Sequence, residues 1–134
     1  MMKQIFLSVA AILGGLSVTA GAFGSHALRG QLSERSLSIF EVGTRYQMYH
    51  ALALLAVAIL LNNTQTPSKS LVISGWLFII GIFLFSGSLY ALSLTDTIYL
   101  GIVTPFGGVA LICGWIALAI SNLGEKGKGE GGKV

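Results

Sequence analysis

Glu41, Arg45 and His50 are ionisable residues inside an otherwise largely apolar segment. Glu41 and Arg45 are four residues apart, and every residue from 51 to 61 is apolar. At this spacing a carboxylate and a guanidinium share one face of a helix, where they can pair or hold an anionic group. The imidazole titrates near neutral pH and could carry a proton or a ligand. Because ionisable groups are costly inside a membrane, this segment is expected to face other helices.

Polar side chains elsewhere in the chain are expected to gather around the same segment. Tyr46 and His50 share one helix face, and Tyr49 shares the other face with Glu41 and Arg45. His50 lies 11 residues before Leu61, the last residue of the apolar segment. This distance is about 16 Å of helix, so His50 is expected near the membrane midplane. The candidate binding cluster consists of His26, Glu41, Arg45, Tyr46, His50, Tyr90 and Thr104.

Each candidate also has a structural interpretation, and the sequence leaves the alternatives open. Glu41 and Arg45 can form an interfacial ion pair, and Arg45 can extend outward to the membrane surface. His50 can be a neutral histidine bonded to a tyrosine or a backbone carbonyl, or part of a proton relay or ligand site. His26 can be an interfacial histidine. The partners expected for the helix that carries His50 are His26, Ser86, Ser88, Tyr90 and Thr104.

Several classes of site are not expected. Two histidines without a third convergent ligand, and the single Cys113, do not indicate a metal site or a cofactor. No nucleophile, base and orienting acid occur at a recognisable spacing, so we expect no enzyme, although activity on a lipid headgroup remains a third hypothesis. Lysines and arginines form no stripe, which argues against nucleic-acid binding.

The composition predicts a membrane protein. The 134 residues are 54% hydrophobic and 10% charged, whereas about 25% of the residues in a soluble domain are charged. So few charges could not cover the apolar surface of a soluble protein of this size, and the lipid bilayer is therefore the expected solvent and partner.

Four apolar segments are long enough to cross a bilayer, which takes about 20 helical residues. They predict an all-α, four-helix transmembrane bundle in one domain, residues 1–121. Residues 122–134 are rich in glycine and lysine and are expected to form a disordered tail. An alternative for the first segment is a cleaved signal peptide. The predicted spans are residues 5–23, 42–61, 71–92 and 98–120.

Four spans place both termini on one side of the membrane. More lysines and arginines flank the terminal side than the opposite side, which favours a cytoplasmic location for the termini. The side of the bundle that carries the termini is therefore the expected inner side, and the opposite side is the outer side. The charges compared are Lys3, Lys69, Lys126, Lys128 and Lys133 against Arg29, Arg35 and Arg45.

Two local patterns predict helix boundaries. Residues 24–37 are expected to form a loop, and Ser38 with Glu41 matches a capping box that would begin the second helix at Ser38. Pro105, which follows Thr104, predicts either a helix start capped by Thr104 or a kink in the fourth helix.

Four ordered motifs resemble a known family. Residues 21–28 read Gly-Ala-Phe-Gly-Ser-His-Ala-Leu, with Ser25 where the family usually has alanine, and residues 46–54, 84–90 and 104–108 match its other motifs. The chain is similar, over residues 5 to 120, to domain of unknown function 423, whose eukaryotic relative is called transmembrane protein 256. The resemblance implies a small multi-pass protein of the bacterial plasma membrane and supplies no activity or catalytic residues.

Two functions are therefore expected to compete. The first is a structural or accessory membrane protein that packs with itself as a homo-oligomer, or with a larger membrane complex. The second is binding or transport of a small molecule, ion or lipid headgroup by the polar cluster in the outer half of the bundle.

Overall fold

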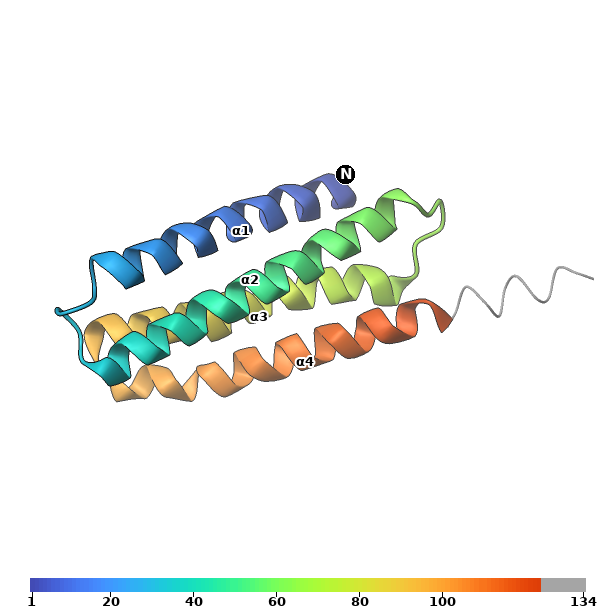
Figure 1. The fold of residues 1–134 in the computed structure, drawn as a ribbon. Coiled ribbons are helices and arrows are strands. Elements are labelled where there is room, and N and C mark those ends of the chain that lie inside the picture. The colour runs from blue at the N-terminus through green and yellow to red at the C-terminus, as the bar shows by residue number, and fades with distance from the viewer. Residues whose placement is uncertain (124–134) are drawn as a thin grey trace, which may run out of the picture.

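The computed structural model describes residues 1–123 as a bundle of four long α-helices (Figure 1). Successive helices run in opposite directions, and α4 ends at the same end of the bundle where α1 begins. We call this end the terminal end and the opposite end the loop end. The helices are α1 (Met2–His26), α2 (Glu34–Asn62), α3 (Lys69–Thr95) and α4 (Thr104–Ser121), with a short 3₁₀ helix η1 (Ile98–Ile102) before α4.

The helices have the length and composition of membrane spans. Each of α1, α2 and α3, and η1 together with α4, is long and apolar enough to cross a bilayer. Large apolar side chains such as Ile12, Phe83 and Ile112 are exposed on the outer surface. A surface of this kind needs a lipid solvent, so the expected four-helix transmembrane fold is confirmed.

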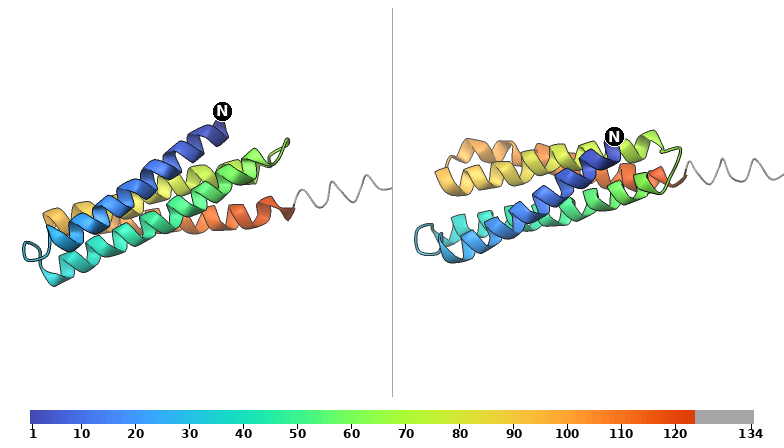
Figure 2. Two further views of the ribbon diagram at one scale, coloured as in Figure 1. Left: turned by 45° about the horizontal axis from the view of Figure 1, so that its top comes forward. Right: turned by 90° about the horizontal axis from the view of Figure 1, so that it is seen from above.

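The central pair of the bundle is α2 and α3. α1 packs against α2, α2 against α3, and α3 against α4. Figures 1 and 2 show α1 and α4 on opposite sides of the central pair. The core is apolar and includes the fully buried Phe6, Leu54, Val57 and Phe78.

Glycines allow the helices to approach closely. A Cβ at Gly107 would collide with backbone atoms of Phe85, so α3 and α4 nearly touch there. A Cβ at Gly114 would lie 2.8 Å from the ring of Phe78. Since lipid is as apolar as the helix faces, such close packing is a main source of association between membrane helices.

The predicted start of α2 at Ser38 is wrong. α2 begins at Glu34, and the Oγ of Ser33 accepts a hydrogen bond of 3.1 Å from the Ser36 amide. α1 also continues to His26, which shortens the predicted loop 24–37 to residues 27–33. The apolar pattern marks the edge of the hydrocarbon, but a capped helix can continue beyond that edge because polar residues are stable there.

The helix-start interpretation of Pro105 is confirmed, although Thr104 is not its cap. α4 begins at Thr104 with Pro105 in its first turn, where the missing amide hydrogen is not needed. The Thr104 hydroxyl instead lies 2.6 Å from the Ser88 hydroxyl of α3. Thr104 therefore joins two helices. Most of the predicted tail, residues 124–134, lies outside the described residues.

Ser33→Ala should lower the free energy of unfolding by about 1 kcal/mol, because the Ser36 amide loses its acceptor. Unfolding in mixed micelles, followed by circular dichroism, would measure the change. Ser38→Ala is the matched control and should change the free energy by less than about 0.5 kcal/mol. A larger effect at Ser38 would contradict the cap at Ser33.

Candidate functional site

Gln47 links three helices inside the loop-end half of the bundle. Its side-chain nitrogen donates a 2.8 Å hydrogen bond to the Leu13 carbonyl of α1. Its side-chain oxygen accepts a 2.6 Å hydrogen bond from the Tyr90 hydroxyl of α3. Gln47 was absent from the candidate cluster predicted from sequence, yet it is buried and it is the partner of Tyr90.

Two serines extend this polar network to the backbone of α2. Ser17 of α1 donates to the Thr44 carbonyl at 2.7 Å, and Ser86 of α3 donates to the Gly43 carbonyl at 2.8 Å. Within residues 1–123, every buried side-chain nitrogen or oxygen has a hydrogen-bond partner. Ser17, Ser86 and Gln47 therefore connect α2 to α1 and α3 by hydrogen bonds.

His50 is buried between α2 and α4, where it makes two hydrogen bonds. Its Nδ1 lies 2.7 Å from the Tyr46 carbonyl, and its Nε2 lies 3.1 Å from Nε1 of Trp115. The indole nitrogen can only donate, so Nε2 accepts and Nδ1 carries the proton. His50 is thus a neutral imidazole in this arrangement, and its expected bond to a backbone carbonyl is confirmed.

The partner that α4 contributes to His50 was not predicted. Trp115 lies 65 residues further along the chain, and its ring also packs edge-on against Phe78. Trp115 is not among the partners that the sequence predicts for the helix of His50, because no local spacing connects the two residues. The indole could have been recognised as a partner only from its depth, which matches that of His50. Comparing depths requires the positions of α2 and α4 relative to each other.

Glu41 and Arg45 do pair, but not in the interior. The Arg45 guanidinium lies 3.4 Å from the Glu41 carboxylate, and the side chains are 61% and 52% exposed. Neighbouring helices were expected to surround both polar faces of α2. This expectation is wrong for the face that carries Glu41 and Arg45. α1 and α3 cover other sides of α2 and leave this face open.

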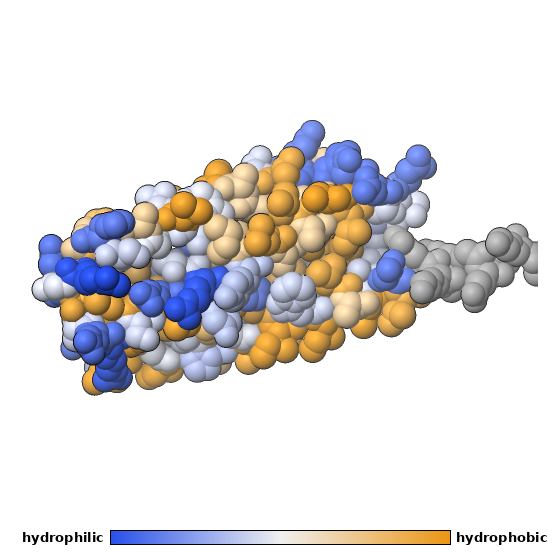
Figure 3. All heavy atoms as spheres, in the orientation of Figure 1, coloured by the Kyte–Doolittle hydropathy of each residue, from blue (hydrophilic) through white to orange (hydrophobic). Residues whose placement is uncertain are grey.

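Two tyrosines continue the exposed face toward the membrane centre. Tyr46 and Tyr49 are 41% and 55% exposed, and their rings are 5.9 Å apart. Figure 3 shows hydrophilic side chains that extend inward from the loop end over α2, whereas the other half of this surface is mostly hydrophobic. We call Glu41, Arg45, Tyr46 and Tyr49 the α2 polar face.

Candidate residues line two different grooves. One groove, of about 590 Å³, lies between α2 and α4 and is lined by Tyr46, Tyr49, His50 and Trp115, among others. The other, also about 590 Å³, lies between α1 and α3 and contains Tyr90. Tyr90 and His50 therefore do not share a cavity.

His26 and Thr104, two of the remaining candidates, line neither groove. His26 is exposed at the end of α1, and Thr104 is bonded to Ser88 at the start of α4. Within residues 1–123, no group of three or more histidine, cysteine, aspartate or glutamate side chains could hold a metal ion.

Comparison with known proteins places the chain in a family. The sequence pattern described as "Protein of unknown function (DUF423)" matches residues 20–108, and this range includes all seven candidate residues. The chain belongs to the DUF423 family. Trp115, the partner of His50, lies beyond the range that matches the DUF423 pattern.

The chain matches relatives over nearly their whole length. A UPF0382 membrane protein of Staphylococcus epidermidis is 44% identical over 120 residues, which cover 90% of this chain and 96% of the relative. The UPF0382 membrane protein YwdK of Bacillus subtilis is 43% identical over 118 residues, covering 88% of this chain and 95% of YwdK. No solved structure matches the chain. With the four apolar helices, these likenesses establish an integral, multi-pass DUF423 membrane protein.

Proposed function

We propose that this DUF423 protein is a structural or accessory component of the membrane that associates with a second copy of itself through the α2 polar face. The observation that carries the proposal is the continuous exposed strip formed by the Glu41–Arg45 pair, Tyr46 and Tyr49. We place the protein in the bacterial plasma membrane, because its relatives are membrane proteins of Gram-positive bacteria. The proposal gives it no catalytic role.

The depth of this face makes exposure to lipid unfavourable. Arg45 precedes the end of α2 at Asn62 by 17 residues, or about 26 Å of helix, in a hydrocarbon core of about 30 Å. Tyr49 lies a further turn inside. By this count Arg45 lies about 4 Å inside the loop-end boundary of the hydrocarbon and Tyr49 about 10 Å inside it, so polar groups of the strip that face acyl chains lose part of their hydration. A second helix laid over the strip would offset part of that loss.

The charges of the strip are complementary to a second copy of themselves. A two-fold axis along the membrane normal places each α2 polar face opposite its duplicate at the same depth. Glu41 and Arg45 differ in height by four residues, or about 6 Å. Their long side chains could bridge that offset, so each guanidinium could pair with the carboxylate of the other copy.

The structure gives less support to binding or transport of a small molecule or ion through the bundle. The interior groups that would carry it, Gln47, His50 and Tyr90, already hydrogen-bond within the chain. Tyr90 and His50 also line different grooves. Packing with a second copy uses the polar groups that remain exposed.

Disulfide crosslinking of a Tyr49→Cys variant would test this interface. With the native cysteine removed by Cys113→Ser, oxidation in native membranes should convert most of the protein to a dimer. Phe83→Cys is the matched control, because Phe83 is exposed at a similar depth of about 20 Å on the α1–α3 side. It should give little dimer. Equal crosslinking at both positions, or none at Tyr49→Cys, would reject the interface.

Charge reversal separates a specific interface from random collision. Arg45→Glu would place carboxylates at both charged positions of each copy and should reduce the crosslinking through Tyr49→Cys. Adding Glu41→Arg restores one positive and one negative group per copy and should recover it. Crosslinking that ignores both changes would show that the ion pair does not contribute.

A further inference from the structure

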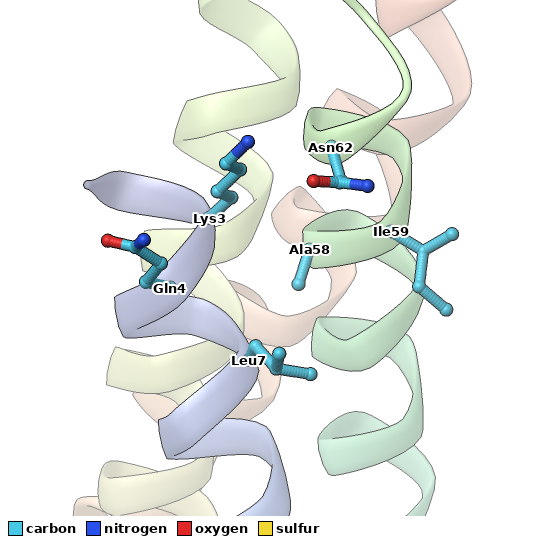
Figure 4. A pocket seen from close by; sticks show the side chains of 6 residues that line it. All are labelled: Lys3, Gln4, Leu7, Ala58, Ile59 and Asn62. Carbon is cyan, nitrogen blue, oxygen red and sulfur yellow. The ribbon is translucent and has the colours of Figure 1, made fainter.

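A cleft opens between α1 and α2 at the terminal end of the bundle. It has a volume of about 410 Å³ and is lined by Lys3, Gln4 and Leu7 of α1 and by Ala58, Ile59 and Asn62 of α2. Figure 4 shows Lys3 and Asn62 on opposite sides of the mouth, with Leu7 and Ala58 further down between the two helices. The cleft therefore has a polar mouth and an apolar floor.

The charge at this end of the bundle is positive and uncompensated within the described residues. Lys3 and Lys69 lie near the ends of their helices here, whereas the three carboxylates of residues 1–123 belong to the loop-end half. Those carboxylates are Glu34, Glu41 and Asp96. Among residues 1–123, an anion at the mouth of the cleft would meet a lysine and no opposing carboxylate.

The two helix ends at the mouth have opposite polarity. α1 begins at Met2, so its first backbone N–H groups add positive potential beside Lys3. α2 ends at Asn62, whose amide and neighbouring carbonyls offer acceptors on the other side. A group that joins an anionic oxygen to hydroxyl donors matches this pair of ends.

Below the polar mouth, the lining of the cleft is apolar. Leu7 and Ile59 are about half exposed and Ala58 is buried, and all three line the cleft about one helical turn below its mouth, so the lower part of the cleft is apolar. Lys3 precedes Leu7 by four residues, which places it about 6 Å nearer the membrane surface. A charged group at the surface with an acyl chain below it fits this arrangement.

From these features we infer that the cleft binds an anionic phospholipid from the leaflet at the terminal end. The phosphate lies against Lys3 and the start of α1, the hydroxyl groups of a glycerol headgroup donate toward Asn62, and an acyl chain lies along Leu7 and Ile59. Basic residues between membrane helices favour anionic headgroups in this way. The site is distant from the α2 polar face and does not depend on self-association.

The test uses the full chain in neutral detergent micelles, titrated with phosphatidylglycerol or with phosphatidylcholine of the same acyl chains. Native mass spectrometry measures the dissociation constant of the first lipid bound. Phosphatidylglycerol should bind at least about fivefold more tightly than phosphatidylcholine, and Lys3→Gln should abolish that preference. Lys3→Arg should retain it.

Lys69→Gln is the matched control, because Lys69 is an exposed lysine at the same end of the bundle and does not line the cleft. It should leave the preference within twofold of the native value. Equal binding of the two lipids, a preference that survives Lys3→Gln, or an equal loss in Lys69→Gln would each overturn the site. Crosslinking through Tyr49→Cys should be unchanged by Lys3→Gln, which separates this inference from the proposed dimer.

Discussion

Gly107→Ala should destabilise the bundle by about 3 kcal/mol, at the upper end of the usual cost of overpacking. A Cβ at this position would collide with the backbone nitrogen of Phe85 and lie 2.7 Å from its Cα. Backbone atoms cannot rotate away as a side chain can. α4 would therefore have to move away from α3, and the hydrogen bond between Ser88 and Thr104 would lengthen or break.

The adjacent glycine supplies the control for this prediction. A Cβ at Gly108 would lie 3.7 Å from the ring of Phe85, which is ordinary van der Waals contact. Gly108→Ala should therefore be neutral or stabilise the helix, since alanine is favoured over glycine by about 1 kcal/mol in a helix interior. Unfolding in mixed micelles of dodecyl sulfate and a mild detergent would measure both variants. Similar stability of the two would contradict the close α3–α4 contact.

Gln47→Leu should lower the free energy of unfolding by about 1.5 kcal/mol. The substitution keeps most of the side-chain volume but removes the hydrogen bonds to the Leu13 carbonyl and the Tyr90 hydroxyl. Hydrogen bonds between membrane helices contribute about 0.6 to 2 kcal/mol each, because partners are scarce in hydrocarbon. The same unfolding measurement applies.

A double-mutant cycle isolates the bond between Gln47 and Tyr90. Tyr90→Phe removes only the hydroxyl and should cost less than Gln47→Leu. In the double variant the effect of Tyr90→Phe should largely vanish, because its partner is already absent. If the two single effects simply add, the bond at 2.6 Å does not stabilise the fold.

The sequence alone determined the solvent of this protein and the number of its helices. Long apolar segments exclude water-exposed packing, and lipid leaves helices as the simplest structure that satisfies every backbone group. Residue spacing also made the pairing of Glu41 with Arg45 one of the predicted arrangements, because side chains four residues apart on a helix are neighbours. Both inferences depend only on composition and local geometry.

Helix ends were predicted less well because several residues compete for the same role. Both Ser33 and Ser38 can cap a helix, and only the folded chain assigns the role to Ser33. The apolar pattern predicts a span that starts at residue 42, and α2 begins at Glu34, before that span.

Only the tertiary structure decided which polar residues are partners. Trp115 reaches His50 across 65 residues, and Gln47 joins Leu13 to Tyr90 across two helix interfaces. The rotation of each helix about its own axis sets these contacts, and close packing at glycines, such as Gly107 between α4 and α3, limits that rotation. The same packing leaves Arg45 exposed on the outside of the bundle. Shape complementarity, and not charge, decides which faces of α2 contact α1 and α3.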